Sequence, residues 1–506
     1  MDFVSIILFM GMYYLRPQEW TGALSKLHPV QLVMFLAVYS VFTRERGFRA
    51  REILRTPHDW LMAAYFGWII FTAPSPWNAF KEIQNVMLFY CIIVQTLTDV
   101  PRLNRFFGWW AVFIMAIVVL ALGSEFGLDP FGSYDRTHGI MKDRLQLNLS
   151  LFDNANALGH SVVPVIPMLF FLLFWKRLFM KTAILILVLP LWCIFLTQSK
   201  GSFLCGFVTV LMTLTFGRPK AVQVAILVLS IGFGYAALYQ LPRMNTLKKA
   251  RNDPGIQGRL AAYTFGLQCL RTHTTGIGYR HWWDEFNRHG PLREKQEHRL
   301  PGQPKRMEHF GIATHGTYNQ NGAELGFTGL FLFIGILYAC MRTVITAKTA
   351  DTEEERVRRI LAVIVISYAV SSWMVDFGFR TTFFMFAAAA SAFHRILMRL
   401  DERAEEEGDH VPILTSPGSV LTPSPVLVTP HPIPVWLMPA EPQRLLTSGS
   451  SDTPELIETH NLHSEDSEEN APPVMKWRRV GLLDLGIIYA LTWGAVKYWA
   501  YIITNL

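Results

Sequence analysis

Apolar stretches separated by short polar loops run through the first 400 residues of the chain. Each stretch is long enough to cross, or nearly cross, the roughly 30 Å hydrocarbon layer of a bilayer. A crossing segment must be helical, because only a helix satisfies every backbone amide within the segment. The pattern predicts an all-α protein with about twelve core transmembrane helices. The predicted segments lie near residues 2–15, 28–43, 58–75, 80–97, 103–123, 156–175, 181–197, 202–216, 221–241, 320–345, 358–377 and 379–398.

The loops between these segments differ in charge. Basic clusters such as "TRERGFRAREILR", "KRLFMK" and "RVRR" follow the even-numbered segments. Because Lys and Arg concentrate in cytoplasmic loops, we expect these loops and the N-terminus in the cytoplasm. The odd-numbered loops then face outward, and the longest of them covers residues 242–319.

The composition changes beyond residue 400. The chain is acidic in "DERAEEEGD" and then rich in Pro, Ser and Thr, a composition that does not form a packed core. We therefore expect residues 1–400 to be the transmembrane core and residues 401–475 to be a disordered cytoplasmic linker. Residues 476–506 carry a basic anchor before a mostly apolar stretch, which predicts an extra C-terminal transmembrane helix.

Composition supports a membrane protein and argues against nucleic-acid binding. Hydrophobic residues make up 51% of the chain and charged residues only 17%, which is too apolar for an ordinary soluble protein. The basic residues behind the net charge of +7 lie mostly in short clusters between apolar segments, where they indicate membrane orientation, so no nucleic-acid partner is expected. Four of the five cysteines fall inside apolar runs, and no disulfide framework follows.

The long outer loop is strongly basic. Residues 242–315 contain thirteen Lys or Arg and six Asp or Glu. A loop of this length escapes the rule that keeps cations in the cytoplasm. The excess is either a solvated surface near anionic headgroups or a binding surface for an anionic ligand.

Two helix starts at the outer face carry a cation. Lys200, in "TQSKGSFLCGF", begins the eighth segment, where Ser199 or Ser202 can cap the free amides. Arg259 lies in the first turn of an amphipathic helix predicted within the outer loop. Helix N-termini favour anions, so both positions suit an anionic ligand. The alternatives are a snorkelling lysine and a simple headgroup contact.

A third helix start carries a titratable group. His315 precedes the tenth segment in "ATHGTYNQNGAELGFTGL", with Thr317 or Asn319 as the expected N-cap. A neutral histidine with a pKa near its usual value of about 6.5 accepts a proton at working pH. Cations that hold a phosphate, beside such a base, fit a phosphate-bearing lipid substrate. The histidines of the outer loop lack the paired spacing of a zinc site, so we expect no metal site.

Two residues further along the same helix are candidates for substrate binding. Tyr318 and Glu324 follow His315, and we expect them to orient the histidine or the acceptor, with packing as the alternative for Tyr318. A glutamate inside a membrane helix is costly unless it faces a cavity or a partner. Asp376 and Arg380, at the outer turn between the last two core segments, are expected to form an ion pair in preference to touching substrate.

The stretches "TQSKGS", "GRLAAYTFGLQCLRTHTTGIGYRHW" and "ATHGTYNQNGAELGFTGL", with a looser match at "FDNANALGHSVVP", resemble the O-antigen ligase and polymerase superfamily. The opening "YYLRPQEW" looks like the branch of exosortase-associated O-glycosylation ligases. The resemblance implies a fold like that of the C-type glycosyltransferases. It also implies that Lys200, Arg259 and His315 are the catalytic residues. The family usually has arginine where this chain has Lys200, and lysine lacks the two-pronged grip on phosphate.

The resemblance further implies an inverting, metal-independent glycosyltransferase without a cofactor. Its donor would be a glycan on a polyprenyl diphosphate such as undecaprenyl diphosphate, used at the periplasmic face of the bacterial inner membrane. His315 would deprotonate the acceptor hydroxyl, while Arg259 and Lys200 stabilise the departing diphosphate. The acceptor is a lipid, a protein or another glycan. A repeat-unit polymerase and a transporter of lipid or polysaccharide without chemistry remain the alternatives.

Overall fold

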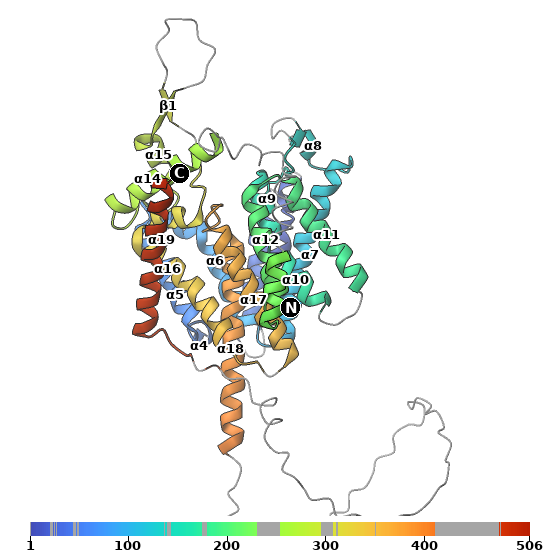
Figure 1. The fold of residues 1–506 in the computed structure, drawn as a ribbon. Helices are drawn as coiled ribbons and strands as arrows, with labels where there is room; N and C mark the ends of the chain where they lie inside the picture. The colour runs from blue at the N-terminus through green and yellow to red at the C-terminus, as the bar shows by residue number, and fades with distance from the viewer. Residues whose placement is uncertain are drawn as a thin grey trace, which may run out of the picture. The chain divides into compact units, whose positions relative to one another are not determined.

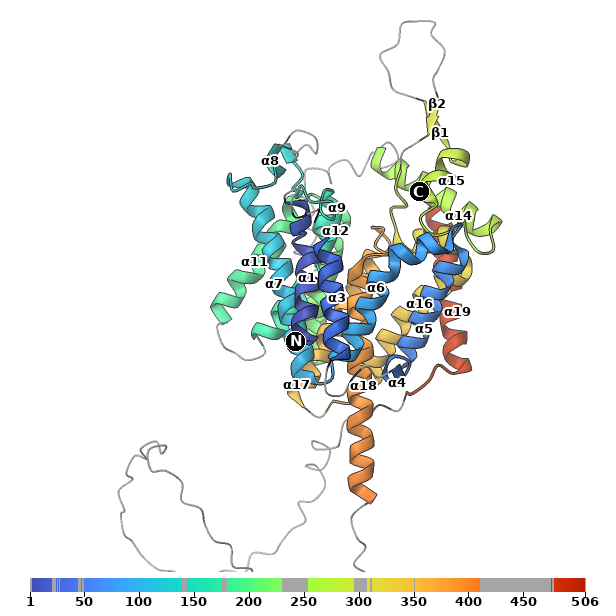
Figure 2. The same ribbon diagram turned by 180° about the vertical axis from the view of Figure 1, so that it is seen from behind.

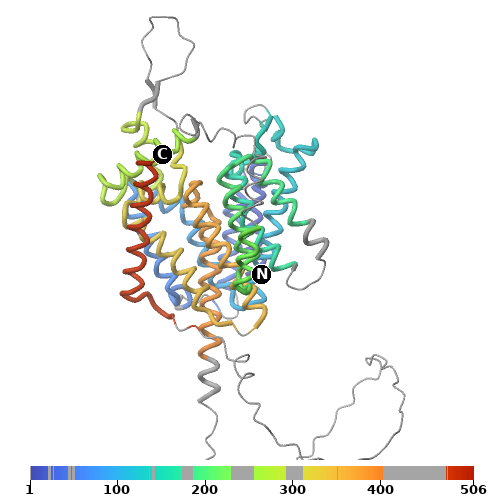
Figure 3. Tube along the Cα trace, viewed as in Figure 1, coloured from blue at the N-terminus to red at the C-terminus, as the bar shows by residue number. Residues whose placement is uncertain are grey.

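The structure is a computed structural model, and Figure 3 follows its trace along the sequence. It describes residues 2–20, 24, 26, 28–43, 47, 50–135, 137–138, 143–174, 180–229, 254–294, 307–309, 312–349, 351–409, 475 and 477–505. Residues 1–402 and 472–506 form one compact unit. Most of the predicted linker, the second half of the predicted ninth segment and much of the basic outer loop lie outside the described residues, so those predictions stay open.

The described elements are helices with one short hairpin. In chain order they are α1 (Asp2–Tyr14), η1 (Pro17–Glu19), α3 (Pro29–Phe42), α4 (Ala50–Ile53), α5 (Pro57–Thr72), α6 (Pro76–Thr96), α7 (Val100–Glu125), α8 (Ser133–Asp135), α9 (Ala155–Val162), α10 (Val165–Leu169), η3 (Phe170–Phe174), α11 (Met180–Leu196), α12 (Lys200–Thr215), α14 (Pro254–Thr272), α15 (Trp282–His289), β1 (Leu292–Glu294), β2 (Met307–His309), α16 (Thr317–Thr346), α17 (Thr352–Ser371), α18 (Thr381–Asp409) and α19 (Leu482–Asn505). A further short helix covers Lys220–Leu229.

The all-α prediction is confirmed, since the only described strands, β1 and β2, pair in one antiparallel hairpin. The greater part of each predicted apolar segment is helical where the chain is described, although the predicted segment 358–377 runs beyond the end of α17 at Ser371. The sixth segment differs in form, because it is divided into α9, α10 and η3. Pro164 and Pro167 explain the breaks, since proline removes a backbone donor and clashes with the preceding turn.

Some of the described helices, but not all of them, have the length and apolar composition of a full membrane crossing. Within the described residues, four helical stretches are long and apolar enough to cross a bilayer: Val100–Glu125, Ala155–Leu173, Thr317–Thr346 and Thr381–Glu402. Other apolar helices, such as α3 and α12, have 10–17 residues and fall short of that length. The chain is thus a multi-pass helical membrane protein, and the count of about twelve core crossings stays a prediction.

Helix α16 is the centre of one group of packed helices. It packs against α5, α14, α17 and α19, and Figures 1 and 2 show α5, α16 and α19 side by side from both directions. A second group places α12 against α9 and α17, and α7 against α1. Helix α17 therefore joins the two groups, because it contacts both α16 and α12.

A kink in α16 fixes the segment that follows α14. Gly326 interrupts the helix with φ 68° and ψ −169°, a conformation that glycine adopts without a Cβ penalty. The kink leaves the carbonyls of Ala323 and Glu324 free to accept from the amides of Ile277 (3.0 Å) and Gly278 (2.8 Å). A Cβ at Gly326 would lie 2.5 Å from the carbonyl oxygen of Thr274. The backbone approach therefore requires glycine.

The C-terminal helix α19 packs into the core unit, and Trp499 is its largest buried side chain. The indole of Trp499 is 1% exposed, and its Nε1 donates to the carbonyl of Tyr263 on α14 at 3.0 Å. The opposing glycines, Gly266 on α14 and Gly322 on α16, leave room for the ring, since a Cβ at either would lie within 3.1 Å of it. Trp499 thus fills the space between α14 and α16.

Trp499→Ala should destabilise the protein, because it leaves a cavity between three helices and removes a buried hydrogen bond. Truncating a buried tryptophan typically costs about 3–5 kcal/mol. We expect the apparent Tm of the purified protein to fall by several degrees, measured by intrinsic fluorescence. Trp493→Ala on the same helix is the matched control, because that side chain is 49% exposed. Equal Tm losses in both variants would show that Trp499 carries no special packing role.

Candidate active site

His315 lies directly before α16 in a left-handed backbone conformation, with φ 55°. Its ring is half-buried. Asn319 in the first turn of α16 connects this turn to its surroundings. Its Nδ2 donates to the carbonyl of Thr314 at 2.6 Å and to that of Ala262 on α14 at 3.2 Å. These bonds attach the strained turn at His315 to α14. Strained non-glycine residues of this kind persist only where their surroundings fix them, and they cluster at functional sites.

The N-cap of α16 is Gly316, so the expectation of Thr317 or Asn319 was wrong. The reason is that the connection between α17 and α18, residues 372–380, supplies the missing acceptors. The amides of Thr317 and Tyr318 donate to the carbonyl of Ser372 at 2.7 and 3.4 Å. The hydroxyl of Thr317 donates to the carbonyl of Val375 at 2.7 Å and accepts from the amide of Phe377 at 2.8 Å. No side-chain cap is needed.

Arg259 and His315 lie near each other. Arg259 is half-buried in α14, and its positive charge acts on His315. Burial is the larger cause and the charge of Arg259 the smaller one, and together they lower the pKa of His315 to about 4. The imidazole is therefore neutral at neutral pH, as a general base requires. Tyr263, one turn along α14 from Arg259, donates to the carbonyl of Trp373 and more weakly to that of His315 at 3.5 Å.

Lys200 is the first residue of α12, and Ser199 is the N-cap. The amide of Ser202 donates to the Ser199 hydroxyl at 3.3 Å, which confirms Ser199 as one of the two predicted caps. The next residue, Gly201, faces two neighbours: a Cβ there would lie 3.0 Å from Met374 and 3.1 Å from Nε2 of His160. The start of α12 therefore lies between α9 and the α17–α18 connection.

His160 on α9 is a candidate that the sequence did not single out as a functional residue. Its ring is 3% exposed, and its Nδ1 lies 2.7 Å from the hydroxyl of Ser371. Arg259 is close enough to act on it electrostatically, as it does on His315. The two histidines thus share one cation. The available signal was "ALGH" within the loosely matching stretch, but a histidine in an apolar helix is usually a packed core residue.

Tyr318 and Glu324 make structural contacts. Tyr318 is 8% exposed, its hydroxyl donates to the carbonyl of Ala369 at 3.2 Å, and its ring lies 4.6 Å from that of Trp373. Glu324 is 2% exposed, and its carboxylate accepts from the backbone amide of Arg280 at 3.0 Å. These contacts hold neighbouring segments in place, and substrate binding by the two side chains stays a prediction.

The expected ion pair between Asp376 and Arg380 is wrong. Among the described residues, neither an ion pair nor a hydrogen bond joins the two side chains, although Arg380 acts on Asp376 over a longer distance. The guanidinium of Arg380 lies instead over the ring of Phe377, 5.5 Å from its centroid. In the part of the chain that the structure describes, no group of three His, Cys, Asp or Glu side chains is placed to hold a metal ion.

Residues 185–334 match the family model of the O-antigen ligases. The match supports the O-antigen ligase superfamily. The matched residues contain all three predicted catalytic residues, while His160 and the α17–α18 connection lie outside them. No curated protein matches the chain. The superfamily implies an enzyme of glycosyl transfer that uses lipid-linked glycans in a membrane, in agreement with the membrane-spanning helices of this O-antigen ligase-like chain.

Gly159→Ala tests the packing of α9 against α12. A Cβ at this position would lie 2.4 Å from Oγ of the buried Ser202, so the two helices must separate. Overpacking of this kind typically costs about 1–3 kcal/mol. We expect a lower apparent Tm and reduced glycan transfer in membranes, because both His160 and Lys200 shift. Gly67→Ala is the control, since no atom lies within 4 Å of its Cβ position. A wild-type Tm in Gly159→Ala would contradict the packing described.

Proposed function

We propose that the chain transfers glycan from a polyprenyl diphosphate donor to an acceptor hydroxyl at the periplasmic face of the bacterial inner membrane. The observation that carries the proposal is a neutral, half-buried His315 within the field of Arg259, at the start of a membrane helix. A base and a cation side by side suit a reaction in which a hydroxyl loses a proton and a diphosphate leaves. The family match to O-antigen ligases supports the same class of reaction.

The proposed step is a single displacement. The acceptor oxygen attacks the anomeric carbon while its proton passes to His315. The bond between that carbon and the diphosphate oxygen breaks, and the electron pair leaves with the diphosphate. Because negative charge on the diphosphate grows in the transition state, Arg259 and Lys200 stabilise it more there than in the ground state. One displacement inverts the configuration at the anomeric carbon, and this chemistry requires neither a metal nor a cofactor.

The surrounding residues have supporting roles in this proposal. His160 and the α17–α18 connection lie against the start of α12, where Lys200 is found, and Arg259 acts on His160. Tyr318 orients the first turn of α16 through its contact with Ala369, and Glu324 orients Arg280 through the backbone. The opening "YYLRPQEW" favours the exosortase-associated branch, with undecaprenyl diphosphate as the lipid carrier and an O-glycosylated acceptor.

His315→Ala should abolish glycan transfer without loss of folding, because the acceptor hydroxyl then has no base. The measurement uses purified protein, labelled polyprenyl diphosphate glycan and acceptor, with transfer followed by gel shift and folding by thermal unfolding. His289→Ala is the control, since this side chain is 63% exposed and pairs with Glu285 on its own helix. Near wild-type transfer by His315→Ala would remove the histidine from the chemistry.

A deletion strain that accumulates single repeat units would indicate a polymerase instead of a ligase.

The pH dependence of kcat/KM should reflect the depressed pKa of His315. The neutral base is present above a pKa of about 4 and is lost as the pH falls through that value. We therefore expect no loss of activity from His315 between neutral pH and about pH 5.5. In Arg259→Gln the residual activity should fall at a higher pH, because one of the two causes of the shift is removed. An acid limb near pH 6.5 in the wild type would contradict a buried His315 beside Arg259.

A further inference from the structure

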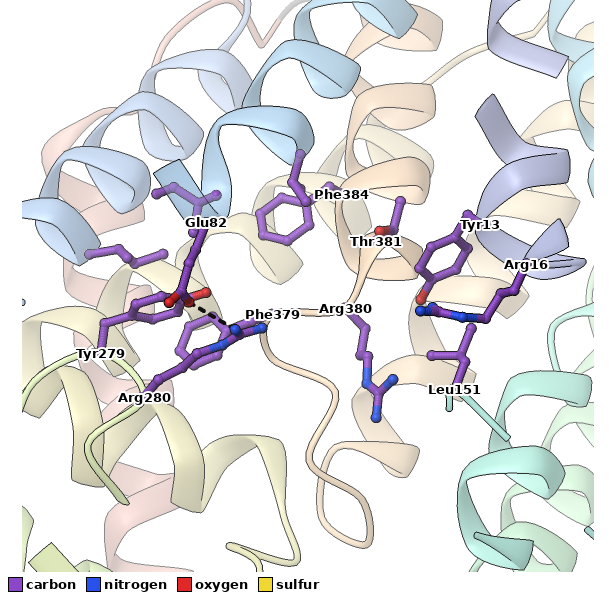
Figure 4. Close-up of a pocket in the computed structure, with 13 residues that line it drawn as sticks. Tyr13, Arg16, Glu82, Leu151, Tyr279, Arg280, Phe379, Arg380, Thr381 and Phe384 are labelled. Atoms are coloured by element: carbon purple, nitrogen blue, oxygen red, sulfur yellow. Dashed lines mark hydrogen bonds and ion pairs between the residues drawn. The ribbon is translucent and has the colours of Figure 1, made fainter. Parts of the chain in front are cut away.

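A cavity near α1, α6 and α18 contains none of the three proposed catalytic residues. It has a volume of about 220 Å³. Its walls come from parts of the chain far apart in sequence: the end of α1 with Arg16, helix α6 with Glu82, the segment before α15 with Arg280, and the start of α18 with Arg380. Figure 4 shows Arg380 between the Arg280–Glu82 pair on one side and Arg16 on the other.

The cavity carries an excess of positive charge. Three arginines line it, against a single acidic side chain, Glu82. Arg280 pairs with Glu82 at 2.8 Å, and Arg16 pairs with Glu19 at 2.5 Å. Within the described residues Arg380 forms no close ion pair. Its guanidinium lies over the ring of Phe377, 5.5 Å from the centroid, and the carboxylate of Asp376 acts on it from a longer distance. A guanidinium that forms no close ion pair with the described residues, at a helix start, is well placed to bind a planar or tetrahedral oxyanion.

Aromatic rings form the rest of the wall. Tyr13, Tyr279, Phe379 and Phe384 line the cavity, and the rings of Tyr279 and Phe379 meet edge to face with centroids 4.8 Å apart. Aromatic surface with a few converging polar groups is typical of small-molecule sites. Sugar rings present apolar C–H faces and polar edges, so arginines beside aromatic rings match a sugar that also carries a negative charge.

Two of the cavity arginines are held in strained backbone conformations. Arg16 has φ 49° and Arg280 has φ 56°, both in the left-handed region that side chains other than glycine rarely adopt. Each is fixed by a carboxylate: Glu324 accepts from the amide of Arg280 at 3.0 Å, and Glu19 accepts from the amide of Ser150 at 2.8 Å as well as pairing with Arg16. Strain that is fixed by its surroundings on both sides of a cavity is evidence of a built site.

We propose that this cavity binds an anionic sugar unit, bearing a carboxylate or a phosphate, of the glycan that the enzyme transfers or extends. Arg380 binds the charged group, the aromatic rings contact the sugar face, and Glu324 acts as a positioning residue through Arg280. The identification of the ligand as a glycan rests on the proposed function, whereas the binding of an anion rests on the cavity alone. The cavity shares the α17–α18 connection with the proposed active site, because that connection follows Ser371, which contacts His160, and ends at Arg380.

The test measures binding to the purified full chain in uncharged detergent by microscale thermophoresis. The probes are glucuronic acid, glucose 1-phosphate, neutral glucose and inorganic phosphate. We expect the two charged sugars to bind at least tenfold more tightly than glucose and inorganic phosphate, and Arg380→Gln to weaken their binding about tenfold. Arg380→Lys should retain part of the affinity, since it keeps the charge. Arg271→Gln, an exposed position at the end of α14, is the control and should bind as the wild type does.

Several outcomes would overturn the inference. Unchanged affinity in a folded Arg380→Gln variant, or inorganic phosphate binding as tightly as glucose 1-phosphate, would remove the sugar site. Loss of charged-sugar binding in nanodiscs of phosphatidylglycerol, but not of phosphatidylcholine, would assign the cavity to a lipid headgroup. His315→Ala distinguishes the two proposals: full transfer by that variant refutes the catalytic role and leaves sugar binding to be judged by Arg380→Gln alone.

Discussion

The proposed active site depends on the hydrogen bonds between the α17–α18 connection and the first turn of α16. A helix that starts below the membrane surface leaves amides without acceptors, and each such amide is expensive to bury unpaired. Here the carbonyl of Ser372 accepts from the first two amides of α16, and the hydroxyl of Thr317 pairs with the carbonyl of Val375 and the amide of Phe377. Because these bonds come from another part of the chain, the position of His315 is set by tertiary structure and not by its own helix.

The same connection also determines where the cations lie. Trp373 accepts from Tyr263 on α14, and Met374 lies against Gly201 at the start of α12. Arg259 belongs to α14 and Lys200 to α12, so both of their helices are fixed against residues 371–380. On the far side, Trp499 fills the gap between α14 and α16. A small displacement of the connection would therefore move His315 and the two helices that carry the cations together, so residues outside the family match shape the proposed site.

The sequence was sufficient to predict the helices, because apolar runs of bilayer length have few alternatives to helix. It was also sufficient for the cap of α12, where Ser199 acts through a local bond to Ser202. It was insufficient for α16, whose cap comes from residues more than fifty positions away, and for Arg380, whose neighbour is an aromatic ring in place of the expected Asp376. His160 was missed for the same reason, since its partner Ser371 is distant in sequence. Local sequence patterns therefore predicted the helices, whereas the contacts around the proposed active site depend on hydrogen bonds between residues far apart in the sequence.

The arrangement of Arg259 beside His315 has a consequence for the proposed reaction. In the free protein Arg259 helps to keep the imidazole of His315 neutral, because its guanidinium would repel a protonated imidazole. A diphosphate bound by Arg259 offsets that repulsion with its own negative charge, and the imidazole then becomes more basic. The histidine is thus a weak base while the site is empty and a stronger one once the donor is in place.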